Sequence, residues 1–123
     1  MINAAHILLY SHNPDADRAF FKDVLQYPFV DVGHGWLIFK MPPSEVAVHP
    51  ADASTRAPGD GTLAASLYLM CDDLAATMAS LNAQHVSCSA ITTERWGHVC
   101  TITLPGGSKL GLYQPTHPTA HDL

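Results

Sequence analysis

The order of apolar and polar positions repeats once along the chain. His6–Tyr10 is a short run of strand-forming residues. A helix is predicted next, because Asn13 suits the position before a helix and Pro14 suits its first turn. Its apolar face is predicted to consist of Phe20, Phe21, Val24 and Leu25. Three short runs bounded by glycine or proline then predict strands at residues 29–32, 35–41 and 45–49.

The second half of the chain follows the same order. Residues 66–70 predict a strand, and Asp72 or Asp73 is expected to cap the helix that follows. Apolar residues at i, i+4 and i+7 give this helix one buried stripe, formed by Leu74, Met78 and Leu81. Three further strands are predicted at residues 86–91, 97–104 and 109–113. Each half therefore reads strand, helix, strand, strand, strand.

This repeat predicts the architecture. A single βαβββ unit is too small to bury both faces of its sheet, so two such units must pack together. We expect an α+β fold in which two βαβββ modules form a curved, mostly antiparallel sheet around a shared cavity. The expected single domain consists of module one at about residues 4–50, a linker at 51–63, module two at about 64–115 and a loose tail at 116–123.

Composition narrows the class of protein. Apolar residues make up 47% of the chain and charged residues 14%, which is typical of a globular domain. A net charge of −5 with only six Lys and Arg argues against nucleic acid as a partner. No apolar run reaches the roughly 20 residues that a membrane helix needs, so no membrane partner is expected.

The cysteines bear on the compartment. Their number, three, is odd, and no C-x-x-C spacing occurs. Cys88 and Cys100 are expected to face each other across a hairpin as two buried thiols rather than as a disulfide. The first ten residues also lack the features of a secretory signal. We therefore expect a cytoplasmic protein.

The duplicated pattern resembles the vicinal oxygen chelate superfamily, which includes glyoxalase I, bleomycin-resistance proteins, fosfomycin-resistance enzymes and extradiol dioxygenases. The resemblance covers residues 6–115 and rests on the stretches NPDADRAFFKDVLQYPFV, LYLMCDDLAATMASLNAQHV and WGHVCTITLPGGSKLGLYQP. More narrowly, the chain is similar to small bacterial glyoxalase-like proteins. The resemblance implies a small-molecule ligand and a homodimer.

The resemblance also implies where a metal ion would bind. In metal-using members each half supplies one ligand from its first strand and one from its last. These positions are His6, Ala47, Ser66 and Gly111 in this chain. Only His6 is a usual metal ligand, so we expect no metal ion and no other cofactor. A reduced metal site of His6 and His49 stays open, because His49 lies two residues beyond Ala47 and points the same way along a strand.

Alternation along the strands predicts the wall of the cavity. The first half is expected to contribute His6, Leu8, Tyr10, Ala47 and His49. The second half is expected to contribute Ser66, Tyr68, Met70, Gly111 and Tyr113. Such a mostly apolar lining suits a small organic ligand, although a closed core with satisfied tyrosines gives the same pattern. The small side chains at positions 47, 66 and 111 favour the cavity.

The catalytic candidates are His6, His49 and His98. His98 qualifies as a general base if it faces the cavity, and its orientation stays open. Trp36 either covers a sheet edge or stacks on an aromatic ligand, whereas we expect Trp96 to be structural.

Three functions fit this sequence. The first is a metal-free protein that binds, or also transforms, a small apolar or aromatic compound. The second is a metal-dependent lyase or extradiol-type dioxygenase that uses His6 and His49. The third is a drug-sequestering resistance protein without turnover, since an acidic protein suits a cationic drug. The loss of usual ligands from three of the four metal positions favours the first.

Overall fold

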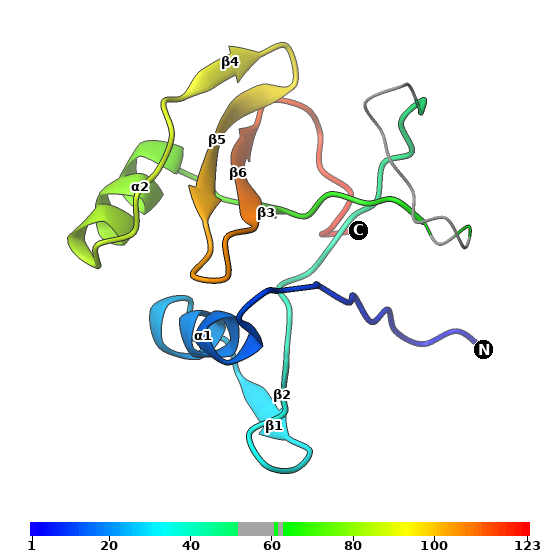
Figure 1. The fold of residues 1–123 in the computed structure, drawn as a ribbon. Coiled ribbons are helices and arrows are strands. Elements are labelled where there is room, and N and C mark those ends of the chain that lie inside the picture. The colour runs from blue at the N-terminus through cyan, green and yellow to red at the C-terminus, as the bar shows by residue number, and fades with distance from the viewer. Residues whose placement is uncertain (52–60, 62) are drawn as a thin grey trace.

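The structure is a computed structural model that describes residues 1–51, 61 and 63–123. The predicted linker lies almost wholly outside the described residues. Figure 1 shows the elements, which in chain order are α1 (Pro14–Ala19), the π-helical turn η1 (Phe20–Val24), β1 (Phe29–Asp31), β2 (Leu37–Phe39), β3 (Tyr68–Met70), α2 (Leu74–Ala83), β4 (Thr92–Glu94), β5 (Gly97–Thr103) and β6 (Lys109–Pro115).

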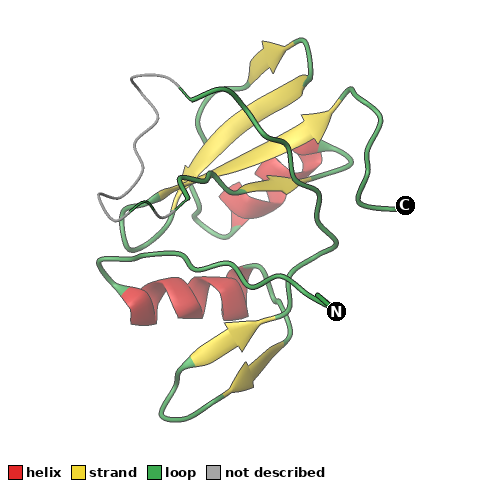
Figure 2. Ribbon diagram, turned by 90° about the vertical axis from the view of Figure 1, so that its right-hand side faces the viewer, coloured by secondary structure: helices red, strands yellow, loops and turns green. Residues whose placement is uncertain are grey.

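The second half forms a four-stranded sheet in the order β3-β6-β5-β4. β3 runs parallel to β6, and the other two pairs are antiparallel. α2 lies against one face of this sheet, as Figure 2 shows. The predicted α+β class and mostly antiparallel strands are confirmed. The strand predicted at residues 86–91 is wrong in its bounds, because only Cys88 forms a bridge there and β4 begins at Thr92.

The first half contains α1, η1 and an antiparallel hairpin of β1 and β2. The strands predicted at residues 6–10 and 45–49 are wrong for this structure, since neither segment pairs its backbone with another described segment. A strand needs a neighbouring backbone to bond to, and alternation in the sequence does not supply one. Figure 1 shows both segments outside the packed helices and sheets.

The core lies between α2 and the sheet and continues into α1 and η1. The predicted stripe of α2 is confirmed, with Leu74 and Leu81 buried and Met78 packed against them. The predicted face of the first helix is confirmed as well, because Phe20 and Phe21 are buried in the same cluster. The sheet and the loops beside it contribute Val86, Cys100, Ile102, Leu104, Leu110 and Leu112.

Side-chain caps explain where the two helices begin. Asn13 precedes α1, and its Oδ1 accepts a hydrogen bond from the backbone N–H of Ala16 at 3.2 Å. Asp73 precedes α2, and its Oδ1 accepts from the N–H of Ala76 at 3.0 Å. Each cap satisfies a backbone donor that the first turn leaves without a partner. The sequence named Asn13 directly and left Asp72 and Asp73 as alternatives.

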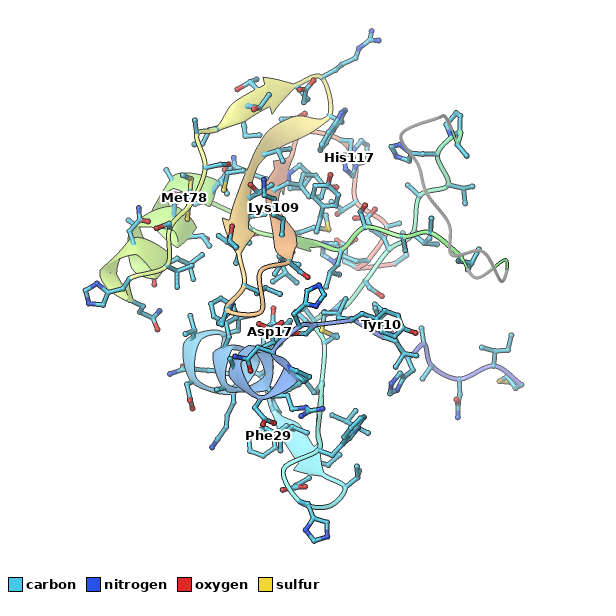
Figure 3. All side chains as sticks on the ribbon, viewed as in Figure 1. Tyr10, Asp17, Phe29, Met78, Lys109 and His117 are labelled. Carbon is cyan, nitrogen blue, oxygen red and sulfur yellow. The ribbon has the colours of Figure 1, made fainter. Side chains whose placement is uncertain are left out.

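A buried carboxylate joins the two halves. Asp17 of α1 is 8% exposed, and its Oδ1 accepts a hydrogen bond from the N–H of Gly106 at 2.7 Å. Gly106 belongs to the turn between β5 and β6, so the bond fixes α1 against that turn. Figure 3 shows Asp17 directed from α1 toward this turn. Glycine is needed here because a methyl group at position 106 would collide with Ser11 Oγ and with the carboxylate of Asp17.

Two further features complete the description. None of the described residues belongs to a helix long and apolar enough to span a bilayer. The tail after Pro115 forms no helix or strand, but it bonds back to the sheet. The N–H of Thr116 donates to the carbonyl of Trp96 at 2.9 Å, and its hydroxyl donates to the carbonyl of Arg95 at 3.1 Å.

Candidate functional site

The sheet of the second half has two chemically different faces. Leu110 and Leu112 of β6 point toward α2, whereas Gly111 and Tyr113 point the other way, because side chains alternate along a strand. The register of the sheet extends this alternation to β3 and β5. We call the side opposite α2 the tyrosine face, and it carries Tyr68, Met70, Val99, Thr101, Gly111 and Tyr113.

Tyr68 and Gly111 fit together on this face. They are register partners in the parallel pair of β3 and β6. The ring of Tyr68 lies directly over Gly111, where any added Cβ would collide with it. The space that Gly111 leaves is therefore filled by an aromatic ring of the same chain. Tyr68 nevertheless remains 44% exposed, so its outer surface is available for contact.

Tyr113 is the centre of an aromatic group. Its ring meets that of Tyr68 edge-to-face at 6.0 Å between centroids and that of Trp96 at 5.5 Å. The imidazole of His117 stacks on the ring of Tyr113 at 6.0 Å between centroids. Trp96 is 42% exposed although it packs on Tyr113. Apolar rings that stay exposed while packed on one another form a preorganised surface for another ring.

A hydrogen-bond chain orients the phenol of Tyr113. The Nδ1 atom of His117 lies 2.7 Å from the carbonyl oxygen of Pro118, which only accepts, so Nδ1 carries a proton. In the neutral imidazole Nε2 then accepts from the hydroxyl of Tyr113, at 2.7 Å. Burial, and next the negative charge of Glu45, raise the pKa of Tyr113 above its ordinary value. The phenol therefore keeps its proton at neutral pH.

Glu45 lies close to this group although it comes from the first half of the chain. Its Oε2 accepts a long hydrogen bond from the N–H of Ala120 at 3.4 Å. Its Oε1 is buried and receives no hydrogen bond from any described residue. The tail that bears His117 and Ala120 thus connects Glu45 with Tyr113.

The residues predicted for the pocket fall into two sets. From the second half, Tyr68, Met70, Gly111 and Tyr113 share the tyrosine face, while Ser66 is exposed two residues before β3. From the first half, all predicted residues are exposed: His6, Leu8, Tyr10, Ala47 and His49. Within the part of the chain that the structure describes, no hydrogen bond or ring contact joins the predicted pocket residues of the first half to those of the second half.

The four metal positions do not fit a metal ion in this chain. The place beside Gly111, where a ligand side chain would be needed, is filled by the ring of Tyr68. Ala47 has no donor atom, and His6 and His49 are both exposed in unpaired segments. Among residues 1–51, 61 and 63–123, no three His, Cys, Asp or Glu side chains lie close enough together to hold a metal ion.

The structure also places the residues whose orientation was open. His98 lies on the α2 side of β5, with the parity of Cys100 and Ile102, and its Nδ1 lies 3.0 Å from the hydroxyl of Thr93. It therefore does not reach the tyrosine face. The guanidinium of Arg18 lies over the ring of Trp36 at 4.5 Å, which is a structural contact.

The three cysteines are free thiols, and of the two predicted to be buried Cys100 is buried whereas Cys88 is half-buried. Burial, and next the neighbouring Cys88, raise the pKa of the Cys100 thiol to about 11. Cys100 is therefore protonated and unreactive near neutral pH, because only the thiolate is a strong nucleophile.

An open groove of about 340 Å³ lies elsewhere, where η1 meets the end of α2 and the turn after β5. Its walls are Phe20, His85, Val86, Ser87, Thr103 and Pro105. None of the residues predicted for the ligand pocket lines it. The groove has no aromatic side chain except Phe20, which the core already buries.

No protein-family model matches the sequence, and no curated protein matches it either. Solved structures do match. The antibiotic binding protein TnmS3 from Streptomyces sp. CB03234 is 20% identical, with a TM-score of 0.61 over 94% of this chain and 100% of that one. Lactoylglutathione lyase from Agrobacterium tumefaciens is 22% identical, with a TM-score of 0.60 over 91% and 92%.

A glyoxalase/bleomycin resistance protein from Streptomyces sp. CB03234 is 21% identical, with a TM-score of 0.53 over 82% of this chain and 90% of that one. All three matches extend over both halves, which agrees with the duplicated pattern in the sequence. At these identities the likeness concerns the fold and not the activity. The chain therefore shares the fold of these three proteins.

Proposed function

We propose that the protein binds a small, flat, apolar or aromatic molecule on the tyrosine face. The observation that carries this proposal is the aromatic group itself: Tyr68 and Trp96 pack on Tyr113 and yet remain more than two-fifths exposed. Burying large rings against a ligand contributes about 25 cal/mol for each Å² removed from water. The phenol of Tyr113 adds a polar group that orients the ligand.

The structural neighbours support binding as the function. One is described as an antibiotic binding protein and another as a glyoxalase/bleomycin resistance protein. Neither description transfers by fold alone, so the residues of this chain have to support the proposal. Here they do, because the exposed rings occupy the sheet face opposite the helix.

We further propose that binding uses no metal ion. The proposal rests on the residue types at the four metal positions and on the Tyr68 ring over Gly111. Elemental analysis of tag-free protein tests it: we expect less than about one-tenth of an ion per chain, whereas a specific site would be nearly filled. Stoichiometric metal that disappears in His6→Ala would contradict the proposal and favour an enzyme.

A homodimer is part of the proposed function. The chain exposes 9432 Å², whereas a compact monomer of its mass of 13.2 kDa exposes about 6,400 Å². Apolar side chains are exposed on the two unpaired segments, among them Leu8, Tyr10, Val46 and Val48. Exposed apolar surface of this kind suits an interface with a second copy. A second copy that covers these segments would place predicted pocket residues of the first half near a tyrosine face.

Fluorescence of single-tryptophan variants tests the binding site, because the chain has only Trp36 and Trp96. In Trp36→Phe the remaining indole is Trp96, and we expect 4-nitrobenzyl alcohol, a flat neutral quencher, to give saturable quenching. In Trp96→Phe the remaining indole is Trp36, and we expect only weak, unsaturable quenching. Saturable quenching of Trp36 alone would place the ligand elsewhere. No saturable quenching in either variant would contradict binding of this class of molecule.

A further inference from the structure

Glu45 is the most unusual polar group in the described structure. Its Oε1 is shielded from water and has no hydrogen-bond donor, while Oε2 has one long bond of 3.4 Å. Burying a carboxylate oxygen without a donor costs free energy, and native proteins keep such groups rare. An unpartnered buried oxygen therefore indicates a missing donor.

The neighbours of Glu45 narrow the identity of that donor. Tyr113 is near enough for the charge of Glu45 to act on it, and Tyr113 is packed against Tyr68 and Trp96. The faces of such rings are electron-rich and attract cations. The hydroxyl proton of Tyr113 is directed to His117, so the phenol oxygen offers a ligand its lone pairs. Glu45, the phenol and the rings thus all favour positive charge.

Cationic side chains of this face do not supply the charge themselves. Lys109 has the same parity as Tyr113 on β6, but four residues of strand separate them, which is about 13 Å. The two described cations that lie over aromatic rings are in the first half: Arg18 lies over Trp36 and Lys22 over Phe29. Among the described side chains, no ion pair involves Glu45.

We propose that Glu45 and the aromatic group around Tyr113 recognise an organic cation, namely an aromatic or apolar molecule that bears a protonated amine. This inference rests on the proposed function and specifies its ligand. The amine donates an N–H to Oε1 of Glu45, and its charge lies near the rings of Tyr113 and Trp96. A donor is needed as well as a charge, so a primary ammonium fits better than a quaternary one.

Four probes with one ring test the inference by saturable quenching of Trp96 in Trp36→Phe. They are 4-nitrobenzylamine, its N,N,N-trimethyl derivative, 4-nitrobenzyl alcohol and 4-nitrobenzoate. We expect the amine to bind about tenfold or more tighter than the alcohol, with the trimethyl derivative between them and the carboxylate weakest. This comparison needs no change at Glu45, so it does not depend on a variant that folds.

The substitution Glu45→Gln then tests whether the negative charge of Glu45 causes the preference for the amine. It should reduce the preference for the amine over the alcohol to about twofold, measured as the ratio of their two dissociation constants in the same variant. Asp23→Asn is the matched control, because it removes the same charge from an exposed position on η1, outside this sheet, and should leave the preference intact. Equal effects of the two substitutions, or no preference for the amine, would overturn the inference.

The test distinguishes recognition of an amine by Glu45 from binding of an aromatic molecule on the tyrosine face. If the alcohol binds and the amine binds no better, the aromatic site is supported and the role of Glu45 is contradicted. If no probe binds, both fail.

Discussion

At the scale of single residues, Asp17 and Cys100 are two buried ionisable side chains whose surroundings determine what they contribute to stability. Asp17 is a carboxylate in the core, and it is kept there because it accepts the N–H of Gly106 from the other half of the chain. Cys100 is a thiol in the core, and its neighbours hold it protonated. Both can be tested by measuring the free energy of unfolding.

Asp17→Ala should lower the free energy of unfolding by about 1–3 kcal/mol, because it leaves the N–H of Gly106 buried without an acceptor. Asp15→Ala is the control on the same helix. Asp15 is exposed and pairs only with Arg18, so its loss should cost less than about 1 kcal/mol. Urea unfolding curves with equal slopes give both values. Equal losses would mean that the bond between the halves contributes nothing.

The thiol of Cys100 should make the protein sensitive to alkali. Its pKa is about 11 in the folded chain against an ordinary value of 9.0, so above pH 9 the unfolded chain loses a proton that the folded chain retains. Stability from this group is complete below pH 9 and falls as the pH rises toward 11, by about 2–3 kcal/mol in all. The stability gap between wild type and Cys100→Ala should therefore shrink over this range in urea titrations. A gap that stays constant would contradict the raised pKa.

At the scale of elements, the sequence predicts what is local and misses what is not. Alternation along β6 is enough to place Gly111 and Tyr113 on one face, because parity follows from the strand itself. Helix starts are equally local, as Asn13 shows. Residues 6–10 and 45–49 have the composition of strands, but their pairing depends on partners far away in the sequence. That these residues line a pocket stays a prediction.

The residues of the candidate site that the sequence did not single out are missed for the same reason. Trp96 is expected to be structural, and neither His117 nor Glu45 is among the residues predicted for the site. The contacts of Trp96 and His117 with Tyr113 arise because the chain turns back after β6, which no periodic pattern records. Glu45 comes near Tyr113 through its bond to the folded tail.

The cap of α2 gives a prediction at this scale that also decides between the two alternatives in the sequence. Asp73→Ala should destabilise the protein by about 1 kcal/mol, because the N–H of Ala76 loses its acceptor. Asp72→Ala removes the same charge one residue earlier and should cost only a few tenths of a kcal/mol. Thermal unfolding of the two variants side by side measures the difference. The reverse order would show that Asp72 is the functional cap.

At the scale of the whole molecule, the feature that needs an explanation is the number of large apolar side chains exposed on the surface. Large apolar side chains are exposed on the tyrosine face and on the unpaired segments of the first half, beside one continuous core. Exposed apolar surface of this kind is typical of sites that bind a ligand or another chain. In the proposed function the ligand covers the tyrosine face and a second copy covers the unpaired segments.

Val48→Lys tests whether a second copy covers the unpaired segments. Val48 is 94% exposed in the single chain, so the substitution should be neutral to within about 0.5 kcal/mol if the protein is a monomer. If a partner covers this position, burying the ammonium should instead lower the melting temperature by about 5 °C or more and shift the mass from twice 13.2 kDa toward one chain. Ala79→Lys, on an exposed position of α2, is the control and should alter neither quantity.

Light scattering coupled to size-exclusion chromatography measures the mass, and a wild-type protein that elutes as a single chain at micromolar concentration would contradict the dimer. Because the predicted pocket residues of the first half lie on the same segments, a dissociated variant should also lose saturable quenching of Trp96, which links assembly to ligand binding in one experiment.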